Sequence, residues 1–170
     1  QRATRKLFVM CGMNKTSKIA LVSLRVALGW LMFYAGITKL LNPEWSAAGF
    51  LAGAKTFAGF FQWFASPEIL PVTNFLNEWG LTLIGASLIL GIFVRISSIS
   101  GILLMILYYL PTLTFPYVGT SSFIVDQHVI FSLVFVLLAS MRAGRYYGLE
   151  NWCSNLPICS KFPKIRSWIG

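Results

Sequence analysis

The stretch IALVSLRVALGWLMFYAGITKLL, residues 19–41, decides the fold class. An α-helix needs about 20 apolar residues to cross the roughly 30 Å of hydrocarbon in a bilayer, and this stretch is long enough. Three further apolar stretches follow at about 73–94, 96–115 and 124–141. They lack the alternation of a half-buried strand, and an open sheet would leave unpaired edges in lipid. The sequence therefore predicts an all-α membrane protein: a four-transmembrane-helix bundle forming one domain over residues 1–170.

The composition excludes several classes of protein. Of the 170 residues, 56% are apolar and 11% are charged, and the mean hydropathy is +0.71. A soluble domain usually has about a quarter charged residues. A disordered chain, an ordinary soluble enzyme and a nucleic-acid-binding domain are therefore excluded, and membrane lipid is the expected surrounding.

The basic residues predict the orientation of the bundle. If both termini and the short turn at Arg95 lie on one side, most of the 14 Lys and Arg residues gather there, and Lys39 and Lys55 remain on the other. Loops rich in Lys and Arg stay in the cytoplasm, so both termini are predicted to be cytoplasmic. The net charge of +9 is then a feature of the inner membrane surface.

Two segments outside the spans are also apolar or aromatic. Residues 46–66 are rich in Phe, Trp, Gly and Ala, and we expect an interfacial helix that caps the outer end of the bundle. A fifth span at this place would put the basic C-terminus outside. The tail, residues 146–170, mixes aromatic and basic residues and is expected on the cytoplasmic surface.

Polar and small residues recur at helical spacing within the spans. In the first span Arg25, Gly29, Met32, Gly36 and Lys39 return to about the same direction, because each helical residue turns the chain by about 100°. The matching residues of the other spans are Glu78, Thr82, Gly85 and Ile89; Ser98, Gly101, Met105, Tyr108 and Thr112; and His128, Ser132, Phe135 and Ala139. These faces are predicted to meet inside the bundle.

Charged groups within lipid cost a few kcal/mol each and need partners. Lys39 and Glu78 lie at a similar depth near the outer surface, which predicts an ion pair, and His128 begins the last span on the same side. Asp126 precedes that span and is expected to cap it, pointing away from His128.

The same residues also have simpler structural interpretations. Arg25 is either an interior group or a side chain that reaches the cytoplasmic phosphates, and Lys39 is either an interior group or the end of a helix in the headgroups. Glu78 is either a structural partner of Lys39 or a functional carboxylate. His128 is either a hydrogen-bonded polar residue or a functional one.

Metal and thiol chemistry are not predicted. One histidine and three cysteines do not make a haem or zinc site, and Cys153 and Cys159 lack the C-x-x-C spacing of a redox pair. Cys11 is placed on the same cytoplasmic side, where thiols stay reduced.

The order of short motifs resembles the DoxX/DoxD family over about residues 19–152. The motifs are RVALGW at 25–30, YAGITKL at 34–40, NPEWS at 42–46, EWGLTLIGASLILGIFVR at 78–95, DQH at 126–128 and GRYYGL at 144–149. Within the family, the chain looks most similar to the DoxD-type small subunit of thiosulfate:quinone oxidoreductase. The positions that match are Arg25, Lys39, Glu78, Arg95, Asp126 and His128.

The resemblance implies a multi-pass subunit in the plasma membrane of a prokaryote. Such a subunit oxidises thiosulfate to tetrathionate and passes electrons to quinone, together with a second, separately encoded subunit. Quinone is then the expected acceptor, with no metal or haem. Under this hypothesis the candidate catalytic residues are Glu78, His128 and Asp126, and the candidate substrate- or quinone-binding residues are Arg25, Lys39, Trp30, Tyr34 and Tyr108.

Two other functions fit the sequence. One is a non-catalytic membrane subunit that anchors or assembles a redox or envelope complex, using the apolar cap and the tail as docking surfaces. The other is a small transporter or lipid-binding bundle. This function fits less well, because the four spans contain no inverted repeat. Assembly into a homo-oligomer is compatible with each.

Overall fold

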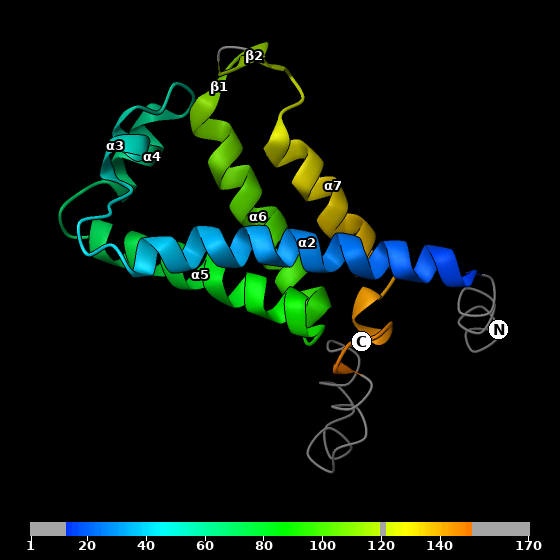
Figure 1. Ribbon diagram of the computed structural model, residues 1–170. Helices are drawn as coiled ribbons and strands as arrows, with labels where there is room; N and C mark the ends of the chain where they lie inside the picture. Colours follow the sequence, from blue (N-terminus) through cyan, green and yellow to red (C-terminus); the bar gives the residue numbers. More distant parts are fainter. Residues whose placement is uncertain (1–12, 120–121, 151–170) are drawn as a thin grey trace, which may run out of the picture.

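The computed structural model describes residues 13–119 and 122–150, and within these residues the chain is mostly helical (Figure 1). Four longer helices form the body: α2 (Lys15–Leu40), α5 (Leu70–Leu90), α6 (Val94–Thr112) and α7 (Gln127–Ser140). Two short helices, α3 (Ala48–Ala52) and α4 (Ala58–Phe64), join α2 to α5. The short 3-10 helix η1 (Ala143–Arg145) follows α7. Cys11, Cys153, Cys159 and the predicted tail beyond residue 150 lie outside the described residues.

Each predicted span coincides with a helix, although the ends differ by a few residues. By length and composition, α2 and α6 are able to cross a membrane. About a third of the most apolar stretch of each helix is buried within the protein. The helix α7 has 14 residues and begins later than the predicted span, because Asp126 caps it. The four-span count and the orientation stay predictions.

The inward face predicted for the first span is confirmed. Arg25, Gly29, Met32 and Gly36 are all buried, whereas Trp30 on the opposite side of α2 is 59% exposed. Small residues on this face let α2 and α5 approach closely. A Cβ atom built on Gly85 of α5 would lie 2.2 Å from the backbone nitrogen of Phe33, so no larger residue fits between the two backbones.

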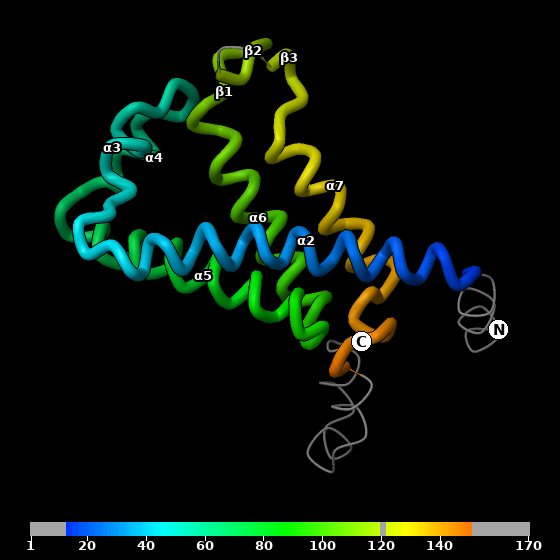
Figure 2. The backbone as a smooth tube through the Cα atoms, viewed as in Figure 1, coloured from blue at the N-terminus to red at the C-terminus, as the bar shows by residue number. Residues whose placement is uncertain are grey.

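The helices are arranged as two pairs. The helix α5 packs mainly on α2, and α6 packs mainly on α7. Figure 2 shows that the two pairs meet near the turn between α5 and α6 and diverge from it. Gly91 and Phe93 in this turn both have left-handed backbone angles, with φ of 67° and 54°, which reverse the chain within three residues. The sequence predicted α5 and α6 as antiparallel neighbours; they touch, but each has its larger interface with another helix.

The segment between α2 and α5 fills the space where the pairs diverge. Instead of one interfacial helix over 46–66, it forms α3 and α4, separated by a turn in which Phe57 has a φ of 53°. The Lys55 amide donates to the Pro111 carbonyl at 2.9 Å, and the Thr56 hydroxyl donates to the Leu113 carbonyl at 2.5 Å. We call residues 45–64 the outer cap, after the membrane side that the sequence predicts for them, and these bonds fix the cap to the end of α6.

A small β-structure was not predicted. The strands β1 (Leu113–Thr114), β2 (Tyr117–Val118) and β3 (Ser122–Phe123) pair antiparallel in the order β1-β2-β3 and connect α6 to α7. Strands of two residues carry too short a pattern to be found from the sequence.

Candidate functional site

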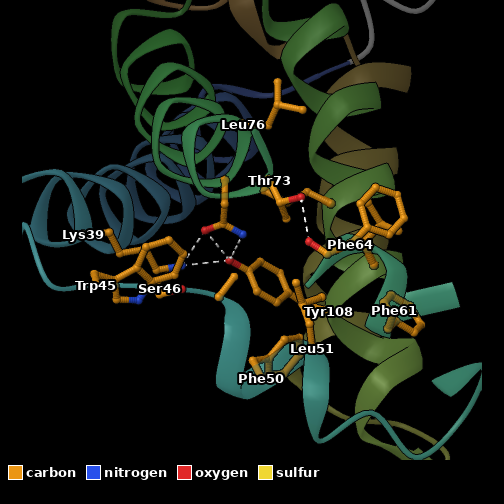
Figure 3. Close-up of a pocket in the computed structure, with 14 residues that line it drawn as sticks. Lys39, Trp45, Ser46, Phe50, Leu51, Phe61, Phe64, Thr73, Leu76 and Tyr108 are labelled. Carbon is orange, nitrogen blue, oxygen red and sulfur yellow. Dashed lines mark hydrogen bonds between the residues drawn. The ribbon is translucent and has the colours of Figure 1, made fainter. Parts of the chain in front are cut away.

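A cavity of about 360 Å³ lies beneath the outer cap, between the end of α2, α5 and α6 (Figure 3). Its walls are mostly apolar and aromatic, from Phe50 and Leu51 of α3, Phe61 and Phe64 of α4, and Leu107 of α6. The cavity therefore exists because the two helix pairs diverge and the cap closes the gap only in part.

Three polar side chains meet at one end of this cavity. The Lys39 ammonium donates to Asn77 Oδ1 and to the Tyr108 hydroxyl, both at 2.8 Å. The same hydroxyl accepts from Asn77 Nδ2 at 2.7 Å and donates to Asn77 Oδ1 at 2.9 Å. Figure 3 shows these bonds converging from three helices, α2, α5 and α6. We call Lys39, Asn77 and Tyr108 the polar triad.

Aromatic rings surround the Lys39 charge. The ammonium lies 4.6 Å from the centroid of the Trp45 ring and 5.3 Å from that of Tyr108, within the range of cation–π attraction. The predicted ion pair of Lys39 with Glu78 is wrong, since the ammonium bonds to Asn77 and Tyr108 instead. Asn77 precedes Glu78 by one residue, a turn of about 100° on the helix, and it is Asn77 that faces α6. Glu78 is near enough to attract Lys39 at longer range.

The Tyr108 ring is held from two sides. The Phe50 ring meets it edge-on at 5.7 Å, and the His128 imidazole stacks on it at 5.8 Å with an interplanar angle of 27°. His128 Nδ1 pairs with Asp126 Oδ2 at 2.5 Å. Asp126 and His128 therefore support Tyr108 from α7.

The predicted cap at Asp126 is confirmed. Its Oδ1 accepts from the backbone amides of His128 and Val129, at 2.9 and 3.2 Å. The expectation that Asp126 points away from His128 is wrong, because a capping residue has extended rather than helical backbone angles, so the helical turn per residue does not apply to it. One carboxylate thus both caps α7 and orients the imidazole.

Substitutions at Asp126 separate these two roles. Asn caps a helix about as well as Asp, so Asp126→Asn is expected to keep most of the stability, whereas Asp126→Ala is expected to cost about 1 kcal/mol more. Thermal unfolding in detergent measures the difference, with the neighbouring exposed Gln127→Ala as control. Equal destabilisation by Asn and Ala would contradict the capping role.

The other candidate residues lie away from the polar triad. Trp30 and Tyr34 are each 59% exposed, on the face of α2 that points away from the other helices. Glu78 is half-buried and does not line the cavity. Arg25 is at the opposite end of the bundle. Sequence reasoning missed Asn77 and Trp45, although Asn77 adjoins Glu78 and Trp45 belongs to the NPEWS motif.

Arg25 ties α2 to the chain after α7. The side chain is 1% exposed, which is inconsistent with the interpretation that it reaches the membrane phosphates. Its Nη1 donates to the carbonyl oxygens of Ala143 and Tyr146, at 2.6 and 3.1 Å, and Nη2 donates to that of Tyr147 at 3.4 Å. Arg25 is therefore part of the packing at the end of the bundle away from the cavity, and it does not line the cavity.

Glu150 is a second buried charge at this end. It is 4% exposed, and its Oε2 has no hydrogen-bond partner among the described residues. Burial raises the pKa of Glu150 to about 7, and this effect outweighs the attraction of Arg145, Arg142 and Arg25. The folded protein therefore holds the proton on Glu150 more tightly than the unfolded chain does.

The raised pKa of Glu150 predicts a pH-dependent stability. Its contribution is complete below the ordinary pKa of 4.5 and is lost as the pH rises through about 7. Glu150→Gln is expected to remove this loss, which is about 3 kcal/mol. Thermal unfolding between about pH 4.5 and 8.5 measures it, with the exposed Glu44→Gln as control. If the stability of Glu150→Gln changes with pH as much as that of the unmodified protein, Glu150 is not the cause of the pH dependence.

Comparison with known proteins identifies the family. A family model described as DoxX matches residues 20–113, which is more than half of the chain. No curated protein and no solved structure matches the chain. The matched range holds Arg25 and the whole polar triad, whereas Asp126 and His128 lie beyond it. Together with the apolar helices α2 and α6, the match shows that the chain is a membrane protein that belongs to the DoxX family.

Proposed function

We propose that this protein is the membrane subunit of a quinone-linked oxidoreductase and that the cavity beneath the outer cap binds the quinone ring. The observation that carries the proposal is the polar triad at one end of an otherwise apolar, aromatic cavity. A quinone likewise has an apolar part, its flat ring, and a polar part, the carbonyl oxygens that accept hydrogen bonds. The cavity volume of about 360 Å³ is in the range of small-molecule sites.

The polar triad is suited to deliver a proton to an oxygen in the cavity. The Tyr108 hydroxyl accepts hydrogen bonds from Lys39 and Asn77 Nδ2 and donates its own hydrogen to Asn77 Oδ1 at 2.9 Å. A quinone oxygen that replaces Asn77 Oδ1 as the acceptor receives this hydrogen. The Lys39 ammonium at 2.8 Å stabilises negative charge on the Tyr108 oxygen and replaces the proton. Tyr108 is then the general acid, Lys39 its proton source, and Asn77 the group that holds both in place.

The resemblance to DoxD-type subunits supports thiosulfate as the electron donor. When bound, quinone accepts two electrons and two protons and becomes quinol. Two thiosulfate ions supply those electrons as they join into one tetrathionate. The cavity walls are too apolar for a small, strongly hydrated dianion, so we propose that thiosulfate reacts on a second, separately encoded subunit and that the complex lies in the plasma membrane of a prokaryote.

The test uses the purified complex with Tyr108→Phe and Lys39→Met. Loss of a general acid typically costs a factor of about 10²–10⁴, and quinone reduction with thiosulfate is expected to fall by that order in both variants. Lys55→Met, an exposed cation on the outer cap, is the control. If both variants keep full activity, the cavity is not the quinone site, and the protein acts as a non-catalytic subunit that anchors the complex.

A further inference from the structure

We propose that the cavity selects a ring that carries an ionised oxygen, the class of an acidic hydroxyquinone, over a neutral ring of the same size. The inference rests on the proposed quinone site and names the chemistry that this site prefers. It is carried by the surroundings of the Lys39 ammonium, which is a charged group with an unused donor at the end of an apolar cavity.

The first step is the count of donors on Lys39. An ammonium has three N–H groups, and two of them are used by Asn77 Oδ1 and the Tyr108 hydroxyl. Among residues 13–119 and 122–150, no further hydrogen-bond acceptor and no carboxylate at ion-pair distance is found for Lys39. One N–H is therefore available to a molecule in the cavity.

The second step concerns the charge. Both hydrogen-bond partners of Lys39 are neutral, Glu78 acts only from longer range, and the faces of Trp45 and Tyr108 give partial compensation. A charge that is partly removed from water is stabilised most by a close opposite charge. An ionised oxygen at the polar triad supplies one and accepts the unused N–H.

The third step excludes a small inorganic anion as the preferred ligand. Most of the cavity wall is formed by apolar side chains such as Leu51, Phe61 and Leu107, which cannot replace the hydration of a small ion. A flat ring contacts these walls while its ionised oxygen reaches Lys39. The two halves of the cavity together therefore select an amphipathic anion.

Binding of two matched probes tests the inference. They are 2-hydroxy-1,4-naphthoquinone, which is ionised at pH 7, and 2-methoxy-1,4-naphthoquinone, which is neutral and has nearly the same shape. A hydrogen bond to a charged group contributes about 1.5–3 kcal/mol, so the hydroxy probe is expected to bind about 10–100 times more tightly at pH 7. Isothermal titration of the detergent-purified complex measures both dissociation constants.

Variants assign the preference to Lys39. Lys39→Met is expected to bind both probes equally, Lys39→Arg to keep most of the preference because it keeps the charge, and Lys55→Met to behave as the unmodified protein does. Equal binding of both probes by the unmodified protein overturns this inference and leaves the quinone site intact. Binding of neither probe overturns both proposals, and a preference that persists in Lys39→Met overturns the role of Lys39.

Discussion

Arg25→Met is expected to detach residues 143–150 from the helices and to lower the free energy of unfolding by about 3 kcal/mol or more. The substitution leaves the buried carbonyl oxygen of Ala143 and the half-buried one of Tyr146 without their donor. Each buried acceptor that loses its partner costs about 1–3 kcal/mol. Methionine fills part of the volume but donates no hydrogen bond, so packing cannot compensate.

Two measurements test this result. Thermal unfolding in detergent gives the loss of stability, and limited trypsin digestion reports the release of the segment, because cleavage after Arg142 and Arg145 should become faster. Lys15→Met, which removes an exposed cation from the same helix, is the control and should change neither measurement. If Arg25→Met has the same unfolding temperature and the same cleavage rate as the control, Arg25 does not hold residues 143–150 in place.

The second large effect is expected at Gly85. Gly85→Ala would place a Cβ atom 2.2 Å from the Phe33 nitrogen, so α2 and α5 would have to separate. Forcing extra atoms into a packed interface typically costs about 1–3 kcal/mol, and contact with a backbone atom favours the upper end of this range. The loss occurs although alanine forms helices better than glycine by about 1 kcal/mol.

Gly80 offers a matched control on the same helix. A Cβ atom built on Gly80 meets nothing within 4 Å, so Gly80→Ala is expected to keep or raise the stability through helix propensity alone. Thermal unfolding of the two variants should therefore move in opposite directions. A Gly85→Ala protein as stable as Gly80→Ala would show that the two helices are not in backbone contact.

The helices and the inward face of α2 could be predicted because they depend on local spacing. A long apolar run defines a helix, and polar or small residues three and four apart define its inner side. Arg25, Gly29 and Gly36 are all buried for this reason. The cap of α7 at Asp126 is likewise a local signal, a carboxylate directly before an apolar run.

The partners of these residues depend on how the helices are placed, and the sequence does not encode this locally. A rotation of one residue on α5 puts Asn77 against Lys39 where Glu78 was expected. Charge alone favoured Glu78, since opposite charges attract, but the divergence of the helix pairs and the bonds of the outer cap decide the geometry. Trp45 was missed for the same reason, because its contact with Lys39 exists only after the loop folds back.

The contact between Arg25 and Ala143 also determines the order of assembly during synthesis. The two residues are separated by 118 positions along the chain. At a translation rate of about 5–20 residues per second, α2 leaves the ribosome roughly 6–24 s before its guanidinium can meet those carbonyls. The nascent protein must keep this cation in water or beside another acceptor until then, so the contacts of Arg25 form only after residues 143–147 have been made.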